Sequence, residues 1–281
     1  MSGSTLRIVL IAGALVLTIV LYLLPKDPLK PKVSAKPQAE LLSGFSFEKY
    51  SADAKTALEW NASGKIDTWE GLLKNEQKPE LYDSIAAVWD STGKPGIAAS
   101  VYERKAAFTQ TEKDWLNAAY RYFDAFKAGR DSAETAHFTG AAIRCYSKVL
   151  ELNPSNLDAK MDLGVVYAEG TAEPMKGIMM LREVVTENPF HENAQMNLGF
   201  LSMKSGQYDK ARERFQKVLE INPSRVDMYV YIGESFVRTG DKKEAIRNFE
   251  IFKNLTNDPQ MIKDIDDYII KLKSEDAASQ K

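Results

Sequence analysis

The residues that could do chemistry are few, and their spacing does not suit it. His191 and Glu192 begin the pattern of a zinc-protease helix, but Gln195 occupies the place of the second metal-binding histidine. His137 is the other of the two histidines, so a metal site would lack ligands and a catalytic triad would lack an oriented base. We therefore expect no enzyme activity, no metal and no cofactor.

Phosphate binding, thiol chemistry and nucleic-acid binding have no better support. Gly64-Lys65 and Gly93-Lys94 lack the upstream glycine and the following serine or threonine of a phosphate-binding loop. The single cysteine, Cys145, falls in an apolar helical pattern, which indicates a small core residue rather than a reactive thiol. With 37 Lys and Arg against 39 Asp and Glu, the net charge is −2, whereas nucleic-acid binding needs clustered basic residues.

A repeat of 34 to 35 residues organises most of the chain. A large apolar residue followed by glycine recurs at Leu163-Gly164, Leu198-Gly199 and Ile232-Gly233. Small residues recur at Gly177, Ala211 and Ala245. Prolines recur at Pro154, Pro189 and Pro223. Such a fixed spacing indicates one supersecondary unit that is stacked several times.

Together these residues resemble the tetratricopeptide-repeat family. Its unit is a pair of antiparallel helices, in which the glycine of the first helix lets the second approach closely and the proline ends the second. The resemblance implies an all-α fold, a tetratricopeptide-repeat α-solenoid of about five helix-turn-helix repeats with a C-terminal capping helix, behind an N-terminal transmembrane helix. The repeat-defining structural residues are then Gly164, Gly199, Gly233, Ala211, Ala245, Pro154, Pro189 and Pro223.

The pattern also divides the chain into parts. We expect an anchor over 1–24, a Pro- and Lys-rich linker over 25–45, an N-terminal helical cap over 46–78 and a repeat array over 79–258. The units of the array cover 79–111, 112–156, 157–191, 192–225 and 226–258. About ten residues near Arg130–Thr139 are expected as an insertion in the turn of the second unit. A capping helix over 259–274 and a disordered tail over 275–281 complete the chain.

The uncharged run Ile8–Leu24 predicts a membrane anchor. Its 17 residues would rise about 26 Å as a helix, close to the thickness of the hydrocarbon layer. A cleaved signal peptide would have a shorter apolar core and a small-residue cleavage site, so the favoured interpretation is a retained single-pass anchor in a bacterial inner membrane. The lysines beyond the run favour a cytoplasmic body, but short-tailed anchors often export the domain behind them, and the side of the membrane stays open.

The resemblance also implies where a partner would bind, because in this family the first helix of each unit lines a concave surface. The residues at these positions are Leu116, Tyr120, Phe123, Met161, Val165, Met196, Phe200, Met203, Val230 and Val237. An apolar, methionine-rich surface suits an amphipathic helix or a hydrophobic segment, since methionine adapts its shape and buried area drives binding. The alternative is that the chain's own insertion, its C-terminal helix or a second copy fills this surface.

Three functions remain open at this point. The leading hypothesis is a membrane-tethered scaffold or adaptor that binds a partner protein through the concave surface. The second is a chaperone-like accessory factor in protein translocation or envelope assembly, which would bind many apolar segments. The third is a structural homo-oligomer, in which the apolar surfaces of two copies cover each other.

Overall fold

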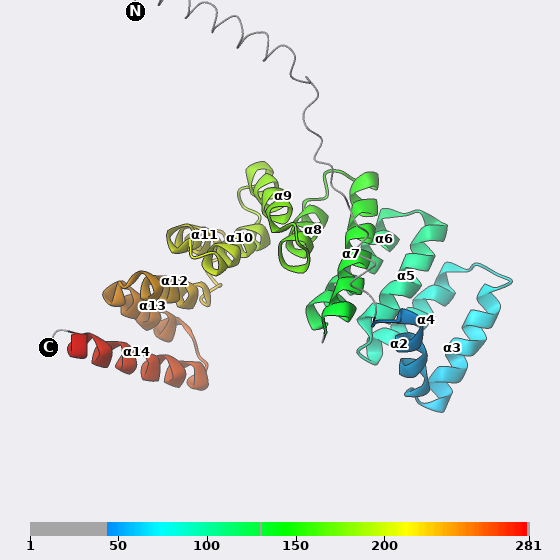
Figure 1. Cartoon of the computed structure of the whole chain (residues 1–281), viewed down its shortest axis with the longest axis horizontal. Helices are drawn as coiled ribbons and strands as arrows, with labels where there is room; N and C mark the ends of the chain where they lie inside the picture. Colours follow the sequence, from blue (N-terminus) through cyan, green and yellow to red (C-terminus); the bar gives the residue numbers. More distant parts are fainter. Residues whose placement is uncertain (1–43, 130, 280–281) are drawn as a thin grey trace, which may run out of the picture. The chain divides into compact units, whose positions relative to one another are not determined.

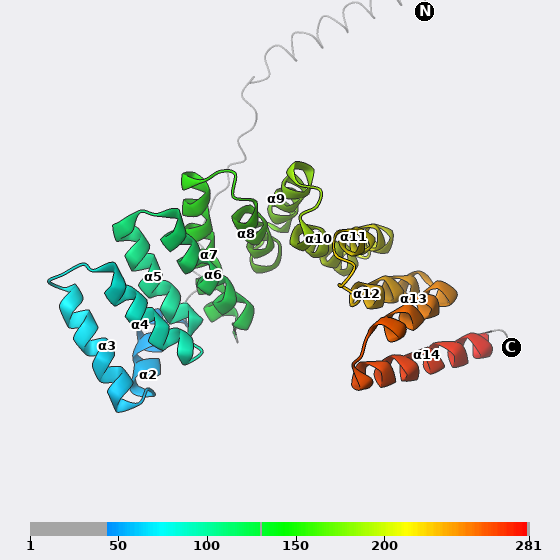
Figure 2. The same ribbon diagram turned by 180° about the vertical axis from the view of Figure 1, so that it is seen from behind.

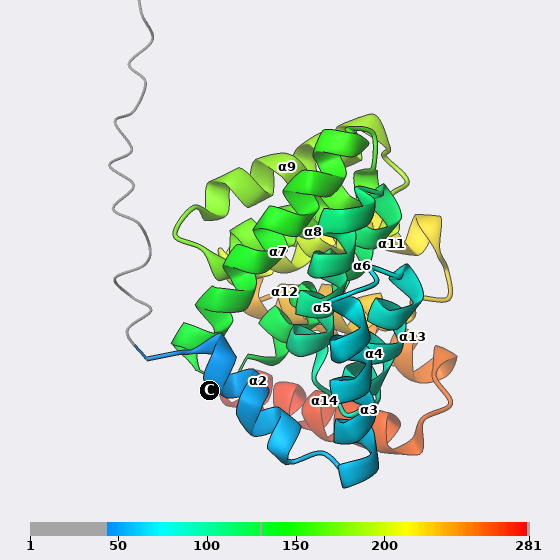
Figure 3. The ribbon, with the colours of Figure 1, turned by 90° about the vertical axis from the view of Figure 1, so that its right-hand side faces the viewer.

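The computed structural model describes residues 44–129 and 131–279, which form thirteen α-helices (Figure 1). They are α2 (Phe47–Thr56), α3 (Trp60–Leu73), α4 (Pro79–Ser91), α5 (Pro95–Thr109), α6 (Glu112–Ala128), α7 (Ser132–Leu152), α8 (Leu157–Gly170), α9 (Pro174–Glu187), α10 (Glu192–Lys204), α11 (Tyr208–Ile221), α12 (Met228–Thr239), α13 (Lys242–Leu255) and α14 (Pro259–Ser279). From α3 onward, each helix packs against the next one in the sequence. Figure 3 views the helices from the end that carries α2 and α3. The described part of the chain is therefore an all-α stack of helix pairs, as the repeat predicts.

Local sequence signals set the ends of these helices. Asn156 accepts a hydrogen bond on its side-chain oxygen from the N–H of Ala159 at 2.9 Å, at the start of α8. Asp241 does the same for the N–H of Glu244 at 3.1 Å, at the start of α13. Such caps satisfy backbone donors that the first turn leaves unpaired. Gly240 ends α12 with a φ of +85°, a conformation that glycine adopts without strain.

The repeated glycines lie where paired helices cross. A Cβ atom built on Gly199 would lie 2.5 Å from Cε1 of Phe215, and one built on Gly233 would lie 2.6 Å from Cε1 of Phe249. Any larger residue would therefore clash with an aromatic ring of the second helix. The glycines allow that ring to pack directly against the backbone of the first helix, which brings the two helices of a pair close together.

The buried apolar side chains of the described residues form four clusters along the stack. The largest extends from α2 to α8, and the other three include Leu181, Phe215 and Phe249 in turn. The recurring small residues Ala211 and Ala245 are fully buried in two of these clusters. Neighbouring helices build the last three clusters, so contacts between units that are adjacent in the sequence hold that part of the fold together.

Helix α14 covers the end of the last pair. Its residues Ile269 and Leu272 are buried in the same cluster as Phe249 of α13, and the two helices lie side by side in opposite views (Figures 1 and 2). The hydroxyl of Tyr268 donates a hydrogen bond to Glu234 of α12 at 3.2 Å. A terminal helix with one apolar face covers a surface that the last repeat would otherwise expose to water.

The extra residues of the second unit lengthen a helix instead of a turn. Helix α7 begins at Ser132 and is 21 residues long. Its cap is Asp131, whose side chain accepts hydrogen bonds from the N–H groups of Ala133 and Glu134 at 2.9 and 2.8 Å. The expected insertion in the turn near Arg130–Thr139 is thus corrected, because Ser132 onward forms the first turns of α7.

The predicted membrane location is also corrected. Among residues 44–129 and 131–279, no helix is both long enough and apolar enough to cross a bilayer. The helices of this part instead carry charged residues beside their apolar faces, as a water-exposed helix of a repeat array does. The run Ile8–Leu24, and with it the predicted anchor over 1–24, lies outside the described residues. The localisation in a bacterial inner membrane is therefore withdrawn.

Candidate protein-binding surface

The residues predicted to bind a partner lie on α6, α8, α10 and α12, and they differ in exposure. Tyr120 on α6 is 39% exposed. Met161 and Val165 on α8 are only 6% and 3% exposed and belong to the core. The others are half-buried, namely Leu116, Phe123, Met196, Phe200, Met203, Val230 and Val237. We call these half-buried residues and Tyr120 the apolar row, which is interrupted at α8.

Phe200 lies at the centre of the apolar row. Its ring is 4.8 Å from the ring of Tyr231, edge to face, and 5.3 Å from the ring of Phe215. Met196 and Met203 pack against the same buried cluster. Aromatic pairs at these distances stabilise a fold beyond the area that they bury. Phe200 therefore helps to hold α10 and α12 together, and the two methionines extend the apolar surface along α10.

Arg225 ties the segment before α12 to α10. Its guanidinium donates hydrogen bonds to Glu192 at 2.7 Å and to Asp227 at 2.9 Å, and one of its nitrogens lies 3.0 Å from Sδ of Met196. Hydrogen bonds to these carboxylates, above all to Asp227, raise the pKa of Arg225 against the effect of its burial, so the group stays charged. This contact holds Met196 of the apolar row in place.

The apolar row has an acidic edge on α6 and α8. Burial raises the pKa of Asp162 to about 6, although the hydroxyl of Tyr146 donates a hydrogen bond to its carboxylate at 3.0 Å. Burial likewise raises the pKa of Asp124. Asp158 lies 3.2 Å from Nε2 of His191. The ionised forms of Asp162 and Asp124, whose pKa values are raised, would gain from a nearby cationic group.

The groups that could do chemistry have structural surroundings. Cys145 is fully buried, and burial raises the pKa of its thiol, so the reactive thiolate does not form. The ring of His137 stacks on Phe47 with 5.2 Å between centroids, whereas His191 caps α10 by accepting a hydrogen bond from Ala194. In the described part of the chain, no group of three or more His, Cys, Asp or Glu residues could hold a metal ion.

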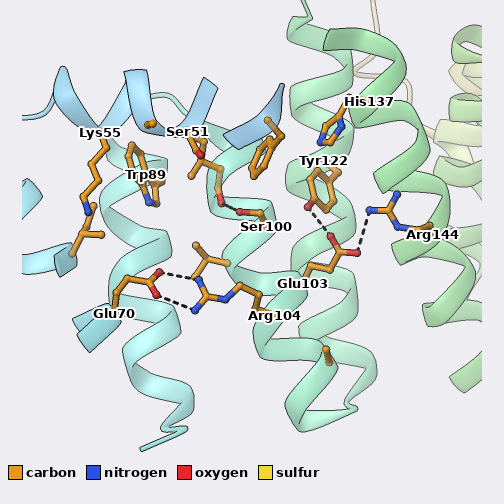
Figure 4. A pocket seen from close by; sticks show the side chains of 16 residues that line it. Ser51, Lys55, Glu70, Trp89, Ser100, Glu103, Arg104, Tyr122, His137 and Arg144 are labelled. Atoms are coloured by element: carbon orange, nitrogen blue, oxygen red, sulfur yellow. Dashed lines mark hydrogen bonds and ion pairs between the residues drawn. The ribbon is translucent and has the colours of Figure 1, made fainter. Parts of the chain in front are cut away.

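A second surface, which the sequence pattern did not reveal, lies on the second helices of the first two units. A cavity of about 700 Å³, open to solvent, lies between α2, α5 and α7, and Figure 4 shows charged side chains that pair with each other in its lining. Arg104 donates to both carboxylate oxygens of Glu70, at 2.8 and 3.0 Å. Glu103 accepts hydrogen bonds from the hydroxyl of Tyr122 at 2.7 Å and from Arg144 at 3.3 Å. The rest of the lining is mostly apolar.

Comparisons with known proteins agree with this architecture. Residues 192–225, which contain α10 and α11, match the tetratricopeptide repeat family. Superkiller protein 3 of Schizosaccharomyces pombe is 27% identical over 128 residues, which are 43% of this chain and 9% of that protein. Anaphase-promoting complex subunit 3 of the same organism is 30% identical over 105 residues, which are 37% of this chain and 16% of that protein. The chain thus spans less than a fifth of the length of these two relatives.

A solved structure shows the same fold. The crystal structure of MamA superposes with a TM-score of 0.51 at 22% identity, over 63% of this chain and 91% of the MamA chain. At that identity the likeness concerns the fold and not the function. Residues 192–225 thus match a tetratricopeptide repeat, and the fixed repeat spacing, the glycine crossings and the fold of the described residues resemble that family, whose members mediate protein–protein interactions.

Proposed function

We propose that this protein is a scaffold that binds a segment of another protein along the apolar row. The observation that carries the proposal is the half-buried state of Met196, Phe200 and Met203 on α10, with Val230 and Val237 beside them on α12. Each of these side chains packs against the core on one side and keeps part of its apolar surface uncovered. A partner that covers this remaining surface gains the hydrophobic free energy of its burial.

The partner that fits best is an amphipathic helix. The apolar row contains Met196 and Met203, and methionines adapt to the shape of an incoming side chain, as expected for a surface that receives one face of a helix. Its acidic edge at Asp124, Asp158 and Asp162 favours basic residues on the polar face of the partner. Tyr120, the most exposed aromatic of the row, offers a ring face to a cation beside this edge.

Two substitutions at the uncovered ends of α10 and α12 test the proposal. The double variant Met203→Glu, Val237→Glu places two charges in the apolar row and leaves Phe200 unsubstituted. We expect crosslinking in native extracts to recover the partners of the unaltered chain and to lose them with the double variant. Met179→Glu is the matched control, because Met179 is a 58% exposed methionine on α9, the second helix of its unit, and so lies outside the apolar row. This control variant should recover the same partners as the unaltered chain.

The double variant Met203→Glu, Val237→Glu also separates the scaffold from the alternative functions. A folded double variant that keeps all its partners would show that the apolar row does not bind them. Recovery of many unrelated apolar peptides without a discrete complex would favour a chaperone-like role instead. A mass that rises with protein concentration, and falls to that of a monomer in the double variant, would assign the apolar row to a second copy of the chain.

A further inference from the structure

Helix α2 is held to the second helices by aromatic side chains. The ring of Phe45 lies 5.1 Å from that of His137, and the ring of Phe47 stacks on His137 at 5.2 Å with an angle of 11° between the planes. Tyr50 meets Phe138 edge to face at 6.0 Å. Both His137 and Phe138 belong to the extra turns of α7. These turns, which depart from the repeat pattern, therefore form the seat of α2.

The seat is built firmly into the stack. Phe138 is 1% exposed, and a Cβ atom built on Gly96 of α5 would lie 2.4 Å from its Cζ atom. Glycine at the start of α5 thus lets the ring of Phe138 enter between the two helices. The seat belongs to the packed core of the first units, where Phe138 also meets the rings of Phe47 and Tyr50.

Helix α2 fits this seat poorly. Of its ten residues, only Ala54 is buried. The cavity of about 700 Å³ remains beneath α2, which lines it with Phe47, Ser51, Ala52 and Lys55 (Figure 4). Ser51 and Ala52 are small, and both line this cavity. Because this cavity is open to solvent, larger side chains of an occupant would remove apolar wall surface from water.

We propose that the face formed by α5 and the first turns of α7 is a second protein-binding site, which α2 occupies and a helix of another protein can take over. That helix carries aromatic residues at the spacing of Phe45, Phe47 and Tyr50, and larger apolar residues in place of Ser51 and Ala52. A second copy's α2 would leave the same cavity unfilled. The α2 of a second copy would also have to displace the chain's own α2. Residues 57–59 link that helix to α3 and so keep it beside the seat at high effective concentration.

The charged groups of the cavity fit an apolar occupant. Arg104 is paired with Glu70, and Glu103 with Tyr122 and Arg144, so the cavity presents satisfied ion pairs at its edges. Side chains that fill the space between them need not supply a compensating charge. The site is also separate from the apolar row, which lies on first helices, so it stands independently of the function proposed above.

The test uses the full chain with Phe47→Ala and Tyr50→Ala, which weakens the hold of α2, and a fluorescent peptide of residues 44–58. A second peptide carries Ser51→Leu and Ala52→Leu. We expect this filled peptide to bind the variant chain at least about tenfold more tightly than the peptide of native sequence, because its added methylenes occupy the cavity. It should bind the native chain more weakly than the variant, because α2 competes there.

Two further changes control for specificity. His137→Glu in the same variant should abolish peptide binding, since it replaces a stacking ring with a charge. Met203→Glu should leave peptide binding unchanged, because Met203 belongs to the apolar row. Failure of both peptides to bind a folded variant, or equal binding of the two, would overturn the proposal. So would a native chain that dimerises by exchanging α2, as measured by light scattering and intermolecular crosslinks.

The same substitutions within the chain give a measurement that needs no peptide. Full-length protein with Ser51→Leu and Ala52→Leu should show about tenfold greater protection of the α2 amides from hydrogen exchange, because α2 would then fill its own seat. It should also resist displacement by the filled peptide. Unchanged protection would mean that the space beneath α2 does not limit the contact and would count against the proposal.

Discussion

At the scale of single residues, glycine decides how closely two helices approach. Gly199 lies against the ring of Phe215, and a Cβ atom there would be 2.5 Å from that ring. Gly140, within α7, has no such neighbour, because a Cβ atom built on it would meet nothing within 4 Å. Glycine therefore allows two helices to approach closely at position 199, whereas at position 140 it only lowers the stability of α7.

We expect alanine to act in opposite directions at these two positions. Gly199→Ala should lower the free energy of unfolding by about 2 kcal/mol, because Phe215 must move to accept the methyl group. Gly140→Ala should raise it by about 0.5–1 kcal/mol, because alanine favours the helix and finds open space. Urea denaturation followed by circular dichroism measures both. Equal effects of the two substitutions would show that close approach is not what requires the glycine.

Asp162 links the stability of the fold to pH. Burial raises its pKa from 3.8 to about 6, so the folded chain binds the proton more tightly than the unfolded chain does. Its contribution to stability is therefore fully present below about pH 3.8 and is lost as the pH rises through about 6. At neutral pH the folded chain holds an unfavourable carboxylate beside the apolar row, and a cationic side chain of a partner would relieve this cost.

At the scale of secondary structure, α2 depends on the protonation state of a single ring. Burial lowers the pKa of His137, and Arg144 lowers it further, whereas Glu103 acts in the opposite direction. The neutral imidazole is thus the form that stacks on Phe47. A histidine whose pKa is lowered by folding contributes stability above its ordinary pKa of 6.5, and that stability is lost as the pH falls below this value.

Helix α2 should therefore loosen on acidification. Between pH 7.5 and pH 5.5 we expect the protection factors of the α2 amides to fall several-fold, while those of α10 and α11 stay nearly constant. Hydrogen exchange, corrected for the intrinsic effect of pH, measures the change. His137→Phe keeps a stacking ring and removes the titration, so it should abolish the difference. A fall of the same size in the phenylalanine variant would contradict the role of His137.

The sequence predicts the second half of the array better than the first. In α8 to α13 the glycines, small residues and prolines repeat at a fixed spacing, and each marks a local event such as a crossing or a helix end. The added turns of α7 follow no repeat. Their packing depends on Gly96 and Phe138, which are far apart in the sequence, so a local pattern cannot reveal it.

The candidate surface is predictable only in part, for a related reason. The register of the repeat places Met161 and Met196 at the same position of their helices, yet Met161 is 6% exposed and Met196 is half-buried. The difference arises from neighbouring units, since Asn197 of the next first helix covers Met161 with its amide 3.5 Å from the sulfur. One feature of the sequence indicates that α2 packs against another helix. The aromatic residues Phe45, Phe47 and Tyr50 lie close together ahead of the array.

At the scale of the whole described stack, stability is a sum of contacts between neighbours, and the ends matter most. Deletion of residues 259–281 removes α14 and exposes the cluster that contains Phe249. We expect the amides of α12 and α13 to lose at least tenfold in protection from hydrogen exchange, while those of α4 to α7 keep theirs. Deletion of residues 276–281 alone is the matched control. A uniform loss over all helices would instead indicate one cooperative unit.

From α8 to α14 the helix pairs pack mainly against their neighbours in the sequence, and this arrangement has a mechanical consequence. A pulling force applied at the C-terminus would act on one interface at a time, beginning where α14 lies against α13. A released unit of 34 residues, such as 192–225, would lengthen by about 110 Å. The stack would therefore yield in steps, so that one end could give way under load while a partner stays bound at the other.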